Sequence, residues 1–371
     1  MTIRFDIPPE PLLKGYLFSF LNSLEHVRVY LSDNTIVVEH EKGRDVTPLI
    51  ARLLRDTAKD MEARKYGFPM SARNDKRTII SGKNSIYKLL GLSPDESFAK
   101  LLEPVADEIE KCSDKEFEEK YYRDEPKFAP VSILRVEHYG AGRKPFFVSK
   151  DLNRTKPKGI TLYKFIILSC GYLLSRSGNV YDDSQKGVTT VLMLPARIGR
   201  YRKPFYDIIR KYMDNVGLLG TRPEEALYLW LALTMPEEAG EIDVVGLIEP
   251  AGQKPARAHL SLHININLQR SMWTQMGIMP DDEEAEDWKF ILREALNSKS
   301  PARDLAIKYS KLLFRASEGS LLAARELLLD SSRLLLILQK TKRLSKEDSR
   351  KREIAKRAIF VGRNLVEKLK R

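Results

Sequence analysis

Cysteine is scarce in this sequence, which contains only Cys112 and Cys170 among 371 residues. The two residues form no CxxC pair and have no histidine at the spacing of a zinc site, so nothing predicts a structural zinc ion. Two cysteines in so long a chain are typical of a reducing, intracellular compartment, where disulfide frameworks are rare.

Long hydrophobic runs are also missing. The nearest approach to a membrane span is 165–174, which is far shorter than the roughly 18 residues required and is interrupted by Ser169 and Gly171. The first ten residues lack the basic-then-apolar order of a signal peptide. We therefore expect a cytoplasmic protein that does not bind a membrane.

The familiar catalytic motifs are absent. The sequence contains no GxxxxGK[ST] phosphate loop, no GxSxG, no HExxH and no carboxylate pair at metal-site spacing. His259 and His263 would lie about 13 Å apart on a strand, so one metal ion cannot bind both. The pair Gly140 and Gly142 lacks the third glycine of a dinucleotide site. We expect a protein that is not an enzyme and holds no cofactor or metal.

Positive charge, in contrast, is abundant and uneven. Residues 301–371 contain 19 Lys and Arg against 8 Asp and Glu, whereas the preceding 300 residues contain 44 and 43. A near-neutral body with a cationic C-terminal part is typical of a nucleic-acid-binding protein. The alternative is a helix bundle whose basic surface only aids solubility.

The hydrophobic pattern predicts an α+β protein. A mixed α/β body is expected over 1–280, with a possible internal boundary near 125–130, followed by a basic four-helix bundle over 281–371. Strands are expected at 27–31, 35–39, 131–136, 189–194, 242–248 and 257–268, and body helices at 11–24, 48–66, 161–176, 204–213 and 223–234. The stretch 73–83 is interpreted as a polar connection, and Ser93 to Glu96 as the capping box of another helix.

Four helical patterns make up the predicted bundle, at 282–297, 302–315, 321–340 and 345–370. The third is apolar on nearly every side, which predicts a central, buried helix. The acids of 281–287 could be taken for a metal site, but they follow Pro280 and are better explained as favourable charge at a helix N-terminus.

The last helix carries a line of cations, here named the basic stripe: Arg352, Lys356, Arg363 and Lys370. They fall opposite the apolar positions at 354, 358, 361, 365 and 369 and extend over about 27 Å. That length matches several phosphates of one nucleic-acid strand. The helix dipole does not explain the run 350–352 near the start of this helix, because cations are mildly unfavourable there.

Two internal segments combine cations with glycines and aromatic residues in loop-like sequence. The first, within 138–164, contains Arg143, Lys144, Lys150, Arg154, Lys156 and Lys158; the second contains Arg197, Arg200, Arg202 and Lys203. Such loops can bind phosphates and stack on bases. The alternative for each is a solvated loop.

The order of these features, residues 192–205 (LMLPARIGRYRKPF), the basic terminal bundle and a thermophile-like shortage of glutamine together resemble the large subunit of archaeal type I-A CRISPR interference (Cascade) complexes. The resemblance implies a non-catalytic subunit that recognises a short motif (PAM) beside the target and helps to open and hold the DNA strands. It implies as partners CRISPR RNA, target DNA, backbone and small subunits, and a helicase/nuclease.

Two other functions fit the same sequence. One is an RNA-processing or RNA-modifying enzyme with a basic C-terminal appendage, and the other is a protein-interaction scaffold. The family resemblance rests on organisation and on no invariant motif, so the cations named above are candidates from their own chemistry.

Overall fold

The structure is a computed structural model that describes residues 2–64, 68–69, 72–124, 126–129, 131–134, 159–182, 187–199, 205–207, 223–248, 257–341 and 343–371. The chain divides into two units. The N-terminal unit comprises Met1–Asn179, Gly187–Lys211 and Ile242–Ser261, and the C-terminal unit comprises Val180–Lys186, Tyr212–Glu241 and Leu262–Arg371. Neither unit begins or ends at residue 280. The predicted domain boundary between residues 280 and 281 stays a prediction.

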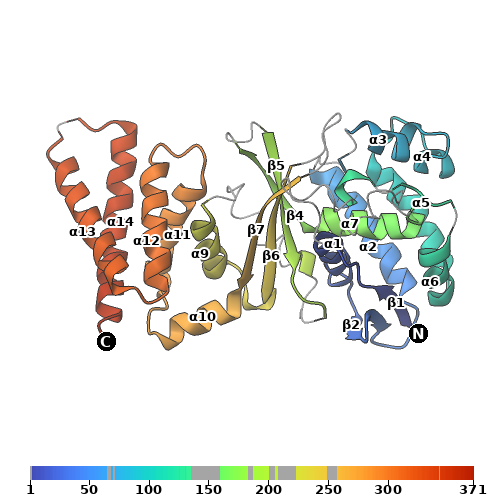
Figure 1. Ribbon diagram of the computed structural model, residues 1–371, viewed down its shortest axis with the longest axis horizontal. Coiled ribbons are helices and arrows are strands. Elements are labelled where there is room, and N and C mark those ends of the chain that lie inside the picture. The colour runs from blue at the N-terminus through green and yellow to red at the C-terminus, as the bar shows by residue number, and fades with distance from the viewer. Residues whose placement is uncertain are drawn as a thin grey trace, which may run out of the picture. The chain divides into compact units, whose positions relative to one another are not determined.

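The N-terminal unit begins with an antiparallel three-stranded sheet of β1 (Thr2–Asp6), β2 (Val27–Ser32) and β3 (Thr35–His40), in the order β1-β3-β2 (Figure 1). The predicted hairpin of β2 and β3 is confirmed, with Tyr30 opposite Val37. Its turn places Asp33 at a φ of 53°, a conformation that Asp tolerates better than most residues.

Helices fill most of this unit. They are α1 (Pro11–Leu21), α2 (Thr47–Arg64), α3 (Arg73–Lys76), the π-helical turn η1 (Arg77–Ser81), α4 (Ile86–Leu89), α5 (Phe98–Lys111), α6 (Asp114–Arg123), the 3-10 turn η2 (Ser132–Leu134) and α7 (Leu162–Ser175). Nearly every side chain of α7 is buried, and α7 packs against α1. The two backbones approach so closely that a Cβ on Gly171 would lie 1.9 Å from the carbonyl oxygen of Tyr16.

Three expectations for this unit are wrong. The stretch 73–83 is helical over 73–81, because α3 and η1 occupy those residues. The carboxylate of Glu96 does accept a hydrogen bond of 2.6 Å from the backbone N–H of Ser93, as in a capping box. This bond closes only a turn, however, and the helix α5 begins after Ser97. Residues 132–134 form a 3-10 turn in place of the expected strand, with all three side chains buried.

A four-stranded sheet has the order β4-β5-β6-β7 and comprises β4 (Arg176–Asp182), β5 (Gly187–Pro195), β6 (Glu241–Ile248) and β7 (Arg257–Asn265). β5 and β6 are antiparallel, with Thr190 opposite Leu247. The strand expected up to residue 268 ends earlier, because the Asn265 side chain accepts a hydrogen bond from the backbone N–H of Leu268 and caps α10 (Ile266–Gln275).

The C-terminal unit contains α9 (Glu224–Thr234), the 3-10 turn η4 (Glu237–Ala239), α10 and the four helices expected from the sequence. These are α11 (Asp282–Leu296), α12 (Arg303–Ser317), α13 (Leu321–Gln339) and α14 (Lys346–Lys368). They lie side by side in Figure 1, and α9 packs against α11 and α12. The α+β fold with a C-terminal helical region is therefore confirmed.

The expected central position of the third bundle helix is wrong. α13 packs against α12 and α14 through a face of mostly short side chains, Ala323, Ala324, Leu327 and Ser331. Its opposite face is apolar and exposed. Among the described residues, α13 is therefore not surrounded by other helices. No helix among the described residues is long and apolar enough to cross a membrane.

Candidate nucleic-acid interface

The basic stripe lies on α14, whose start is fixed by a capping box between Ser345 and Asp348. Its predicted buried face is confirmed at Ile354, Ala358, Val361 and Leu365. Of the stripe, Lys356, Arg363 and Lys370 are exposed, and Lys370 follows the last helical residue. Arg352 is half-buried, and its Nε is enclosed without a hydrogen-bond partner among the described residues.

Four other cations of α14 form ion pairs, three of them with the bundle helix α11. Arg350 pairs with Glu294 of α11, Arg357 with Asp287 at 2.5 Å, and Lys368 with Glu284 at 2.5 Å. Lys351 pairs within α14 with Glu347 at 2.5 Å. The guanidinium groups of Arg350 and Arg357 also lie 4.5 and 4.2 Å from the ring centroid of Phe290.

These contacts explain most of the run 350–352 that the helix dipole leaves unexplained. Arg350 forms an ion pair with Glu294 on α11, and Lys351 forms one with Glu347 in the preceding turn of α14. Of the three cations, only Arg352 belongs to the basic stripe. Asp281 caps the N-terminus of α11, as expected for an acid at that position. Other acids of α11 also form ion pairs with α14. No stripe residue forms an ion pair with any residue in the part of the chain that the structure describes.

The pKa values of two carboxylates that pair with α14 are shifted by their surroundings. Burial raises the pKa of Glu284, against the opposing effect of the Lys368 ammonium. Burial also acts to raise the pKa of Glu294, but hydrogen bonds from Arg350 and Ser300 outweigh it and leave that pKa below its usual value. The paired cations are thus neutralised, whereas the basic stripe and Lys346, at the start of α14, keep charge that can bind a ligand.

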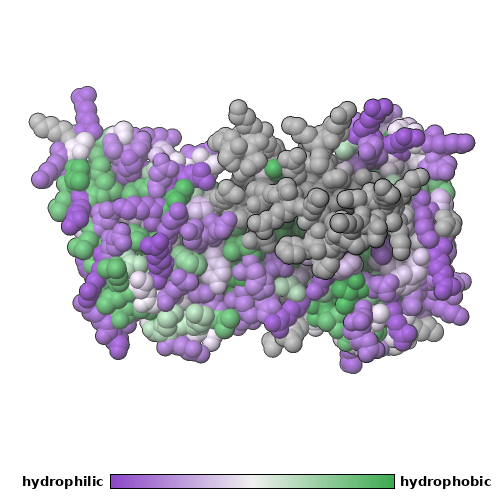
Figure 2. Space-filling view, in the orientation of Figure 1, coloured by the Kyte–Doolittle hydropathy of each residue, from purple (hydrophilic) through white to green (hydrophobic). Residues whose placement is uncertain are grey.

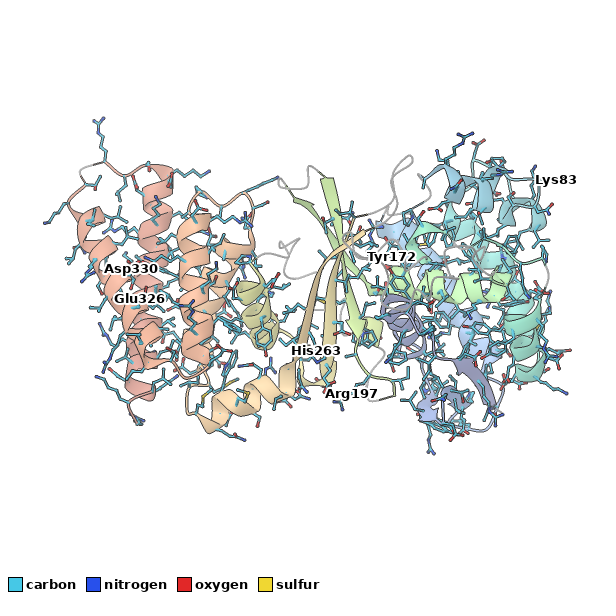
Figure 3. All side chains as sticks on the ribbon, viewed as in Figure 1. Lys83, Tyr172, Arg197, His263, Glu326 and Asp330 are labelled. Carbon is cyan, nitrogen blue, oxygen red and sulfur yellow. The ribbon has the colours of Figure 1, made fainter. Side chains whose placement is uncertain are left out.

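Arg197 is the member of the second internal basic segment that the structure describes, and its side chain is exposed (Figure 3). Asn22 fixes the backbone around it: the side-chain amide donates to the carbonyl of Arg197 and accepts from the N–H of Gly199, each at 2.9 Å. The backbone carbonyl of Asn22 accepts from the N–H of Phe205, also at 2.9 Å. Arg200, Arg202 and Lys203 lie outside the described residues, between two positions that are bound to Asn22.

The backbone at Gly199 requires glycine. Its φ is +73°, and a Cβ would lie 1.7 Å from the carbonyl oxygen of Val29 in β2. The turn after β5 therefore packs directly on the hairpin strand, and the segment that follows starts from a fixed point.

The first internal basic segment also has fixed flanks. Arg143, Lys144, Lys150, Arg154, Lys156 and Lys158 all lie outside the described residues. Before them, the N–H and hydroxyl of Ser132 donate to the buried carboxylate of Asp75 at 3.0 and 3.1 Å. After them, Ile160 exchanges two backbone hydrogen bonds of 2.8 Å with Phe128. These anchors hold both ends of the segment on the N-terminal unit.

Another group of cations on this unit lies outside the two internal basic segments. Arg73, Lys76, Arg77, Lys83 and Lys88 are all exposed on α3, η1 and α4 or the turn between them, and Figure 3 labels Lys83. Asp75, the acid among them, is buried and bound to Ser132. The sequence signal for this group is five cations against one acid over 73–88, part of which the polar pattern wrongly predicts to be a connection.

No group of three or more His, Cys, Asp or Glu side chains with the arrangement of a metal site occurs among the described residues. His263 lies exposed near the end of β7. The described residues offer exposed cations and the fixed flanks of two basic segments, and exposed cations are a means of binding phosphates.

A comparison with protein-family models identifies a match. A family model described as "CRISPR-associated protein, CsaX" matches residues 36–335, most of the chain. The match ends within α13, so α14 and its basic stripe follow it. A search of the curated proteins found no match.

Proposed function

The chain belongs to the CsaX family of CRISPR-associated proteins, and from this premise we propose that it is a non-catalytic, nucleic-acid-binding large subunit of a type I-A, CRISPR-RNA-guided surveillance complex. In this role it recognises the motif beside the target and helps to open and hold the DNA strands. Its partners are CRISPR RNA, target DNA, the backbone and small subunits, and a helicase/nuclease.

The observation that carries this proposal is the division of charge on α14. Arg350, Arg357 and Lys368 form ion pairs with carboxylates of α11, whereas no residue of the basic stripe forms an ion pair among the described residues. Cations that stabilised the bundle would be paired with it. An unpaired row of about 27 Å fits a phosphate backbone, which binds with little regard to base sequence.

The N-terminal unit supports the recognition step. Its two internal basic segments are flanked by anchored residues, and a loop whose ends are fixed can present side chains to the base edges in a groove. The exposed cations of α3, η1 and α4 add phosphate contacts on the same unit. Within this proposal, the N-terminal unit distinguishes sequences and the stripe contributes general affinity.

The absence of catalysis is part of the proposal and has its own test. The purified chain is incubated with labelled DNA and RNA in Mg²⁺ or Mn²⁺, and both are expected to remain intact. Cutting or chemical conversion that follows the protein peak through purification would favour the RNA-processing or RNA-modifying enzyme.

The decisive experiment compares the assembled complex with and without this chain. Target duplexes carry the correct or an altered flanking motif, the guide is complementary or not, and each affinity is measured at two salt concentrations. We expect the chain to be required for discrimination of the motif and to add salt-dependent affinity. Equal discrimination with and without the chain would contradict the proposal and leave the scaffold function.

A further inference from the structure

The outer face of α13 carries a regular row of exposed apolar side chains. Leu322, Leu329 and Leu336 are 76, 56 and 60% exposed, and the adjacent Ile337 is 63% exposed. A spacing of seven residues returns to nearly the same side of a helix, with a drift of about 20° per step. Figure 2 shows apolar surface over this helix.

This row is not explained by the packing of the bundle. The opposite face of α13 is the one that packs, and it approaches α14 so closely that a Cβ on Gly362 would lie 3.1 Å from the Cα of Leu328. Leucine repeated every seven residues is the usual seam of paired helices. A contiguous apolar row of this kind marks a protein interaction site.

The charges beside the row specify the partner. Glu326 precedes Leu329 by three residues and Arg333 follows it by four, so both lie on the same flank of the row. Both are exposed, Figure 3 labels Glu326, and neither forms an ion pair with another described residue. The flank is therefore acidic before Leu329 and basic after it.

We propose that this face binds α13 of a second copy of the chain in antiparallel orientation, centred on Leu329. About that centre, Leu322 meets Leu336 of the other copy, and each Glu326 meets an Arg333. Flanks of the same kind face each other across a two-fold axis, so Arg325, on the other flank, lies opposite Ser332. In a parallel pair the unlike flanks would face each other, which would place Glu326 near Arg325 and leave Arg333 beside Ser332 without an opposite charge.

The size of the face sets the expected strength. α13 has 19 residues, about 28 Å of helix. A single helix pair of this length lies at the small end of specific interfaces, so we expect a reversible dimer with a dissociation constant of roughly 1–100 μM. This inference does not depend on nucleic-acid binding.

The first test is sedimentation of the full chain over roughly 1–300 μM, which spans that range of dissociation constants. The wild type is expected to shift from monomer to dimer, and Leu329→Glu to remain monomeric, because two like charges would meet on the axis. The matched control is Leu268→Glu on α10, where the leucine is 58% exposed, and this variant is expected to dimerise normally. A wild type that stays monomeric throughout would overturn the proposal.

The second test distinguishes a second copy from any other partner. Glu326→Arg and Arg333→Glu are each expected to weaken dimerisation at least fivefold, because each variant places like charges across both contacts. Mixing the two variants is expected to restore dimers, now formed from one chain of each kind, and the double variant is expected to dimerise alone. Unchanged circular dichroism excludes unfolding. Single variants that dimerise like the wild type, or a mixture that stays monomeric, would contradict the antiparallel pair.

Discussion

The side-chain oxygen of Asn22 accepts a hydrogen bond of 2.9 Å from the backbone N–H of Gly199, although the two residues are 177 positions apart. The same amide donates to the carbonyl of Arg197, so both polar ends of one side chain hold the turn after β5. Asn22 follows the last residue of α1, and its own carbonyl holds Phe205. One residue therefore anchors both ends of the second internal basic segment.

Replacement of Asn22 should destabilise the N-terminal unit. Asn22→Ala removes a buried side chain together with its part-buried hydrogen bonds to Arg197 and Gly199, and we expect a loss of about 1–3 kcal/mol in the free energy of unfolding. Urea denaturation measures it. Asn34→Ala in the exposed hairpin turn is the control and should change the stability by less than about 0.5 kcal/mol. Equal stability of the two variants would show that the two bonds contribute nothing net.

Gly171→Ala should be strongly destabilising. The added methyl group would overlap the carbonyl oxygen of Tyr16 and force α1 and α7 apart, at a cost of at least about 1–3 kcal/mol. Ser169→Ala, two residues away on the same helix, is the matched control. Its buried hydroxyl has no hydrogen-bond partner among the described residues, so its removal should be neutral or stabilising. A stable Gly171→Ala protein would disprove the close approach of these helices.

The stability of the α11–α14 pair should depend on pH through Glu294. A pKa that is lower in the folded than in the unfolded chain stabilises the fold above the unfolded value, and that stabilisation is lost as the pH falls through the folded value. Glu294→Gln should therefore cost the most stability above about pH 5 and progressively less below about pH 4. Urea denaturation across this range measures the difference. The exposed Glu367→Gln is the control, and a pH-independent cost at Glu294 would refute the ion pair as its source.

The basic stripe should set the salt dependence of binding to duplex DNA. Alanine at Arg352, Lys356, Arg363 and Lys370 removes up to four cations that bind phosphates, and the slope of log affinity against log salt should flatten by about 0.9 for each phosphate that is no longer neutralised. The half-buried Arg352 is expected to contribute least. The control replaces four exposed cations of the N-terminal unit with alanine: Lys42, Arg44, Lys111 and Lys115. If both sets change the slope equally, only net charge matters and the stripe is solvated surface.

Local signals in the sequence predicted the elements well, and long-range packing accounts for the errors. Apolar periodicity with capping residues located all four bundle helices, because both signals act within one turn. The same periodicity could not place α13, since an apolar surface is equally compatible with a buried helix and with one that binds another molecule. The pairing of Arg350 with Glu294 was likewise invisible, because the two residues lie 56 positions apart. The anchoring role of Asn22 had no sequence signal at all.

The internal basic segments should discriminate between target sequences, whereas the stripe should not. A hydrogen bond to a base edge contributes about 1–3 kcal/mol of discrimination, while removal of a cation that binds a phosphate lowers affinity for all sequences alike. Alanine is placed singly at Arg143, Lys144, Arg200 and Arg202, and binding by the assembled complex is compared on targets with correct and altered flanking motifs. At least one variant should reduce the ratio of the two affinities about fivefold, equivalent to roughly 1 kcal/mol.

Two further variants extend this comparison to the anchor of the second segment and to the basic stripe. Asn22→Ala should reduce the same ratio, because it releases the turn from which the second segment starts, even though Asn22 itself is buried and contacts no ligand. Lys356→Ala on the stripe is the control and should weaken both targets by the same factor. If all four segment variants behave like Lys356→Ala, these loops only position the backbone. Motif recognition would then be sought at Arg73, Arg77 and Lys83, which lie exposed on the same unit.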